Sequence, residues 1–224
     1  PARVGASIID MSTGMWGAMG ILALLVRRAT GSGGGVVDAS LLESGLAWMG
    51  LNFAALQADG TVPQRGGLQG PLISPNGGFT ANDGIIMIVV GTDPQFARLS
   101  SLLDLPGLSE DERFATSNAR FSNRTALTQE LNAALSQKDR AHWASLLNEA
   151  NIPNAPVQNL AEAIEHEQTK ALEIVQTNPN TKFSVIGLPL RFDGHRPGYD
   201  GRSPALGEHN DDVFGDGNGK LKND

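Results

Sequence analysis

The longest apolar run of the chain lies close to its amino-terminal end. From Met15 to Val26, every residue has an apolar side chain except Gly17 and Gly20. A helix without a polar face is typical of a protein interior. The run of about 12 residues is shorter than the roughly 20 needed to cross a bilayer. The pattern therefore predicts a buried helix and no membrane span.

The next periodic segment predicts a second helix, from Leu41 to about Ala58. Ser40 and Glu43 have the spacing of a capping box, which indicates where this helix begins. Residues 36–38, just before it, have the pattern of a short strand. We interpret Trp48 and the apolar stripe of this helix as core. The stripe consists of Leu42, Leu46, Met49 and Phe53.

Beyond a loop over residues 59–78, helical and strand patterns alternate. The predicted elements are a strand over 85–90 behind an Asn82-Asp83-Gly84 turn, helices starting at Asp93 and near 109–114, 123–136 and 140–150, an extended piece over 155–157, a helix from 160 to about 176, and an edge strand over 185–192.

Composition limits the function classes. The 224 residues carry a net charge of −7, which argues against non-specific nucleic-acid binding but permits an anionic ligand held by a few local cations. The chain has no cysteine, which excludes disulfides and thiolate chemistry and fits a reducing, cytoplasmic location. The histidines lack metal-ligand spacing, so no metal site is expected. They are His142, His166, His195 and His209.

The amino terminus shows neither an initiator methionine nor a signal-peptide pattern. It leads almost at once into the apolar helix, which needs packing partners. We therefore expect the sequence to begin within a domain.

Asp10 is the candidate for chemistry, because it lies just ahead of the apolar helix. One interpretation is structural: Asp10 could be an N-cap residue or a first-turn acid, and Ser12 or Thr13 could also cap the first turn. The other is a nucleophile or base that the helix dipole and the free N–H groups keep ionised. The residues alone leave both open.

The Gly- and Pro-rich stretch over 59–78 also has two interpretations. It is either a boundary between domains or a mobile loop that closes over a site and excludes water.

Eight segments, in order, resemble the class III CoA-transferases, also called the CaiB/BaiF group. An ordered set of this length is more specific than any single motif. The segments are Ile9–Trp16, Gly20–Leu25, Val37–Glu43, Phe79–Gly84, Phe96–Leu99, Asp111–Thr116, Ile152–Val157 and Leu206–Asp211.

The resemblance implies an α/β fold that is part of the family III fold: a portion of a Rossmann-like large domain plus a small α+β domain. By this analogy, residues 1–45 belong to the large domain and carry the catalytic aspartate. Residues 46–70 form a linker helix and a Gly/Pro loop, 71–165 the small domain, and 166–224 a linker that returns to the large domain.

The resemblance also implies a reaction. Asp10 matches the family's catalytic aspartate, which would form a mixed anhydride with the donor acyl group and then an aspartyl-CoA thioester. The loop residues Gly66, Gly67, Gln69 and Gly70 lie where the family carries a glycine loop. CoA thioesters and carboxylic acids would be substrates, with no bound cofactor or metal, in an interlocked homodimer without nucleic-acid or membrane partners.

Two other functions stay open. A 2-methylacyl-CoA racemase would pair the aspartate with a histidine for proton transfer at the α-carbon. Alternatively, the chain is a non-catalytic fragment that lacks its CoA-binding half.

Overall fold

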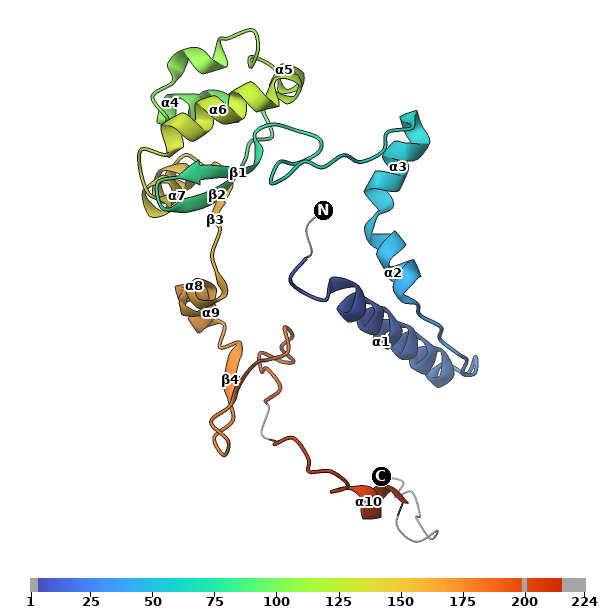
Figure 1. The fold of residues 1–224 in the computed structure, drawn as a ribbon. Helices are drawn as coiled ribbons and strands as arrows, with labels where there is room; N and C mark the ends of the chain where they lie inside the picture. Colours follow the sequence, from blue (N-terminus) through green and yellow to red (C-terminus); the bar gives the residue numbers. More distant parts are fainter. Residues whose placement is uncertain (1–3, 199–200, 215–224) are drawn as a thin grey trace.

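The computed structural model describes residues 4–198 and 201–214. Figure 1 shows three parts in an open arrangement: an arm of three helices (α1 to α3), a body of helices around a small sheet (β1 to β3 with the helices between them), and a carboxyl-terminal part from α8 to α10. The body contains the hydrophobic core of the described chain.

The arm begins with α1 (Ile8–Ala29), which starts earlier than the apolar pattern predicted. The prediction that this helix is buried is wrong: only Ser12 is buried, and Leu22 is 61% exposed. The reason is that α2 covers one stripe of α1 and leaves the other apolar stripes open. By length and composition, α1 is the one helix of the described residues that could cross a membrane, a test that core helices of soluble proteins also pass.

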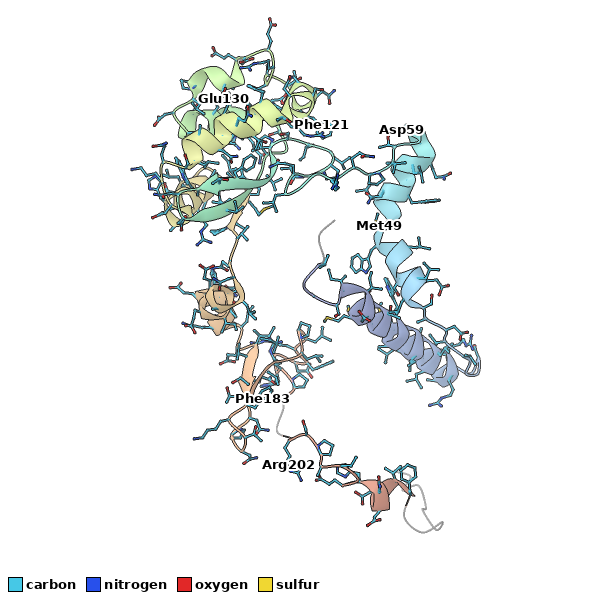
Figure 2. All side chains as sticks on the ribbon, viewed as in Figure 1. Met49, Asp59, Phe121, Glu130, Phe183 and Arg202 are labelled. Atoms are coloured by element: carbon cyan, nitrogen blue, oxygen red, sulfur yellow. The ribbon has the colours of Figure 1, made fainter. Side chains whose placement is uncertain are left out.

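The predicted helix over residues 41–58 is divided in two, α2 (Leu41–Trp48) and α3 (Gly50–Asp59). Met49 lies at the junction with φ −89° and ψ 10°, outside helical geometry (Figure 2). The core interpretation of Trp48 and of the apolar stripe is also wrong, because these side chains are exposed. The short strand predicted over residues 36–38 is wrong, because these residues form no strand in the structure.

The body is built on a three-stranded antiparallel sheet in the order β1-β2-β3. Its strands are β1 (Asn76–Ala81), β2 (Gly84–Val89) and β3 (Asn154–Pro156). The predicted Asn82-Asp83 turn is confirmed, since Ala81 pairs with Gly84 across the hairpin. The strand predicted over 85–90 and the extended piece near 155–157 are confirmed within a residue or two.

Helices complete the core of the body. They are α4 (Asp93–Leu102), η1 (Pro106–Ser109), α5 (Ser117–Ser122), α6 (Arg124–Leu135) and α7 (Arg140–Glu149). The predictions for α4, α6 and α7 are confirmed. The helix predicted near 109–114 is wrong: a 3-10 turn ends at Ser109, and Asp111 bends the chain by accepting the N–H of Arg113.

Arg120 is fully buried in this core. Its guanidinium lies 4.5 Å from the ring centre of Phe96 and donates to the carbonyls of Ser74 (3.1 Å) and Phe114 (3.0 Å) and to Asp93 (2.7 Å). One side chain therefore joins the loop before β1 to α4 and to the turn before α5.

The carboxyl-terminal part contains short elements: α8 (Leu160–Glu165), α9 (Glu167–Ala171), β4 (Val175–Thr177), β5 (Ser184–Ile186) and α10 (Asn210–Phe214). The single helix predicted over 160–176 is wrong, because His166 interrupts it and caps α9 through Nδ1. The strand predicted over 185–192 ends at Ile186, three residues before Pro189.

Candidate active site

Asp10 lies inside the first turn of α1, as a first-turn acid and not as the N-cap or a residue ahead of the helix. Ser7 is the N-cap residue, and its side chain makes no capping hydrogen bond. The Asp10 side chain is exposed and accepts no hydrogen bond from the described residues. The first N–H groups of a helix have no partner within it, so they and the helix dipole favour a negative charge here.

Two hydroxyl contacts fix this turn against α2. The indole N–H of Trp48 donates to Ser12 Oγ at 3.0 Å, and the hydroxyl of Thr13 lies 2.8 Å from Ser44 Oγ. Ser12 and Ser44 are the buried residues of their two helices. The sequence patterns did not predict these contacts between α1 and α2. They indicated Ser12 and Thr13 only as possible helix caps, and they did not single out Ser44.

A cavity of about 460 Å³ lies beside Asp10. Its wall combines the start of α1 with the indole of Trp48, so it offers both a carboxylate and apolar surface. The lining residues are Val4, Ala6, Ser7, Ile8, Ile9, Asp10 and Trp48. An exposed carboxylate at the edge of such a cavity can attack an electrophilic carbonyl without first losing a partner.

The glycine-loop candidates lie elsewhere, against β1. The N–H of Gly70 donates to the Asn76 carbonyl at 2.6 Å, and Gln69 Nε2 donates to the Gly78 carbonyl at 3.1 Å. A Cβ on Gly77 would lie 2.8 Å from Gln69 Oε1, so this close approach depends on glycine. None of Gly66, Gly67, Gln69 and Gly70 lines the cavity beside Asp10.

The charged groups with shifted pKa values lie outside this cavity. The backbone N–H of Arg140 lowers the pKa of Asp83 in the hairpin turn of the body, and a hydrogen bond from Thr61 lowers the pKa of Asp59 at the end of α3. Within residues 4–198 and 201–214, no three His, Asp or Glu side chains gather as metal ligands.

Comparison with known proteins assigns the chain to a family. The family model for CoA-transferase family III matches residues 1–210. The chain belongs to CoA-transferase family III.

Curated relatives carry transferase names. The chain is 31% identical over 96% of its length to an acyl-CoA transferase of Fusarium pseudograminearum and 30% identical over 93% to the acetyl-CoA:oxalate CoA-transferase of Acetobacter aceti. It covers 48% and 54% of these two proteins, so it spans about half the length of the curated relatives it matches.

Solved structures share the fold. A CaiB/BaiF family protein from Brucella suis is 30% identical, with a TM-score of 0.80 over 95% of this chain and 56% of that protein. The predictions of the family and of a partial α/β family fold are therefore confirmed.

Proposed function

We propose that the protein transfers coenzyme A from an acyl-CoA donor to a carboxylic acid, with Asp10 as the nucleophile. The observation that carries the proposal is the place of Asp10: exposed, in the first turn of α1, beside a cavity of about 460 Å³. The names of the relatives support the same reaction class.

The first half of the reaction would load Asp10. Its carboxylate attacks the thioester carbonyl, the C–S bond breaks, and CoA thiolate leaves a mixed anhydride. The thiolate then attacks the Asp10 acyl carbon and releases the donor carboxylate. The product is an aspartyl-CoA thioester, and each step forms one acyl bond as it breaks another.

The second half would run the same steps in reverse with the acceptor acid. The acceptor carboxylate attacks the aspartyl thioester, giving a new anhydride and CoA thiolate. The thiolate attacks the acceptor's acyl carbon and frees Asp10. Oxyanions would develop at every step, and the positive end of the α1 dipole would favour that negative charge.

The anhydride must be protected from water, whereas Asp10 is exposed in the described chain. We infer that a cover closes over the cavity in the active assembly. One candidate is the loop with Gly66, Gly67, Gln69 and Gly70, and another is a second copy of the chain. The exposed apolar side chains of α1 to α3 support a homodimer, interlocked as the resemblance implies.

We also propose the division of the chain drawn from the resemblance: residues 1–45 and 166–224 in the large domain and its linker, 46–70 as connection, and 71–165 as the small domain. The core cluster supports it, because its residues run from Phe79 to Ile152. The absence of cysteine supports a cytoplasmic location.

Substitution of Asp10 tests the function. In the intact gene product, Asp10→Asn should abolish acyl-CoA-dependent CoA transfer, because an amide is a poor nucleophile. Asp104→Asn is the matched control, since Asp104 is an exposed aspartate in the body. Full transfer activity in Asp10→Asn would overturn the proposal. Hydrogen exchange at the substrate's α-carbon without any acceptor acid would instead indicate a racemase.

Binding of CoA tests whether residues 1–224 alone carry the site. Calorimetric titration showing micromolar affinity would exclude a non-catalytic fragment. No binding by this chain, together with activity of the intact gene product, would show that CoA contacts come from outside these residues.

A further inference from the structure

A second cavity, of about 490 Å³, lies in the carboxyl-terminal part of the chain. Its wall is formed by β4 and by the loop after β5. The charged and polar side chains that line it are Glu173, Gln176, Thr177, Arg191, His195 and Arg196. None of its lining residues belongs to the cavity beside Asp10.

The two arginines converge on one backbone oxygen. Arg191 donates to the Leu172 carbonyl at 2.7 Å, and Arg196 donates to the same oxygen at 3.1 Å. Arg191 also donates to the Gly194 carbonyl at 3.3 Å, and Arg196 to the Leu188 carbonyl. The two guanidinium groups are therefore held as neighbours by backbone acceptors.

Two neighbouring cations repel each other unless an anion lies near them. Among the described residues, neither arginine forms an ion pair with a carboxylate. Glu173 lines the cavity but pairs with neither of them. The carbonyls supply only partial charges, and Glu173 offsets one of the two cations on the cavity wall. The cavity therefore keeps a net positive charge although the whole chain is acidic.

Close packing holds Arg196 in this position. A Cβ on Gly187 would lie 2.9 Å from Gln176 Cδ and 3.1 Å from Arg196 Cδ, so a larger residue would displace both side chains. Gln176 Nε2 donates to the Pro197 carbonyl at 3.0 Å, which attaches β4 to the loop. Arg196 Nε is shielded from solvent and finds no acceptor, so this side chain is incompletely satisfied as it stands.

We propose that this cavity binds a small oxyanion, a carboxylate or phosphate group, between Arg191 and Arg196. Paired guanidinium groups suit the planar, bidentate recognition of such groups. The anion would balance the positive charge that Glu173 leaves uncompensated, and His195 could add a hydrogen bond from the cavity wall. The site is independent of the Asp10 chemistry.

The first test is a titration of the full chain labelled with ¹⁵N at arginine, with inorganic phosphate in one arm and succinate in the other, at constant ionic strength. The Nε–H resonances of Arg191 and Arg196 should shift and saturate together. Arg202 is an internal control, because it pairs with Glu208 at 2.7 Å on the segment leading to α10 (Figure 2). Saturation with phosphate alone identifies a phosphate site, saturation with succinate alone identifies a carboxylate site, and saturation with both identifies a site for either group.

The second test uses Arg191→Gln and Arg196→Gln, with Arg202→Gln as the matched control. Each of the first two should weaken binding by about tenfold or more, because each removes a charged hydrogen-bond donor. Arg202→Gln should leave the affinity unchanged. If either cavity variant does not fold, the wild-type titration decides.

Two outcomes would overturn the proposal. If the Arg191 and Arg196 resonances do not saturate with either anion, the cavity does not bind an oxyanion, and groups of the protein itself balance the two arginine charges. If the Arg202 resonance shifts as much as those of Arg191 and Arg196, the anions only screen surface charge and do not bind in the cavity. Because neither readout involves transfer activity, failure of this site and failure of Asp10 as nucleophile remain distinguishable.

Discussion

The body and the arm have similar hydrophobic periodicity but opposite burial. Ile86, Leu131 and Leu147 of the body have no exposed surface, whereas Leu42 and Phe53 of the arm are 72% and 60% exposed. In the body, each apolar face meets another helix or strand, even where the partner is distant in sequence, as β3 is from β2. In the arm, the neighbours of α1 among the described residues are α2 and the segment that joins the two helices, in which Val37 lies against Gly20. Hydrophobic periodicity therefore predicts where a helix or strand forms, whereas its burial depends on whether other elements pack against its apolar face.

The largest expected effect is in the body. Leu131→Ala should lower the free energy of unfolding by about 2–5 kcal/mol, because it leaves a cavity in a closed core. Leu22→Ala in α1 is the matched control and should cost about 0.5 kcal/mol or less in the chain as described, since Leu22 is already exposed. Urea denaturation followed by circular dichroism measures both. Equal losses would show that the arm has a core of its own.

A smaller effect is expected at Arg120. Arg120→Met keeps the apolar stem over Phe96 but leaves the carbonyls of Ser74 and Phe114 without this donor. We expect a loss of about 1–3 kcal/mol in urea denaturation. Arg124→Met is the control, because Arg124 also lies over an aromatic ring, that of Phe121, but is not part of the buried core. A similar loss in both variants would contradict a specific role for Arg120.

Trp48 links the arm internally, so its replacement should have a more local effect. Trp48→Phe removes the donor to Ser12 Oγ and should cost about 1 kcal/mol. Hydrogen exchange should show faster opening of the first turns of α1 and no change in the body. Trp16→Phe is the control, since no hydrogen bond of the Trp16 indole is found in the described chain. Faster exchange across the body would indicate that arm and body unfold together.

The smallest effect concerns pH. Arg140 contacts Asp83 at 3.1 Å and Glu162 at 3.4 Å. The Arg140 backbone N–H is the main cause that lowers the pKa of Asp83 from its ordinary value, and the Asn159 backbone N–H is the main cause that lowers the pKa of Glu162. Because these pKa values are lower in the folded state, their contribution to stability is present above the unfolded values and is lost as pH falls through the folded ones.

Unfolding midpoints in urea, measured at several pH values, check this. The acid-side decline should become shallower in Asp83→Asn, since the amide does not titrate. Glu130→Gln is a control on the outer face of α6. An unchanged decline in Asp83→Asn would rule out this carboxylate as a contributor.

The sequence predicted most of the body because its signals are local. Pro94 marks the start of α4, the Asn82-Asp83 turn sets the hairpin, and the spacing of Leu127 and Leu131 defines α6. The helix expected near 109–114 failed because Asp111 uses its side chain to bend the backbone. The break at His166 had no clear signal in the apolar pattern.

The site was predicted less completely. Asp10 came from its place beside an apolar helix and from the family resemblance, and both rest on a short stretch of sequence. The hydroxyl contacts of Ser12 and Thr13 with α2 depend on how two helices pack, which periodicity does not give. The convergence of Arg191 and Arg196 on the Leu172 carbonyl joins residues about 20 positions apart. Local sequence patterns could not predict it either.

The most direct test of the central claim is a covalent one. The intact gene product is incubated with an acyl-CoA and hydroxylamine, and its peptides are analysed by mass spectrometry. Hydroxylamine attacks activated acyl groups, so we predict a hydroxamate on Asp10 that forms only when acyl-CoA is present and is absent from Asp10→Asn. If the enzyme transfers CoA but no hydroxamate is found on Asp10, the account is contradicted.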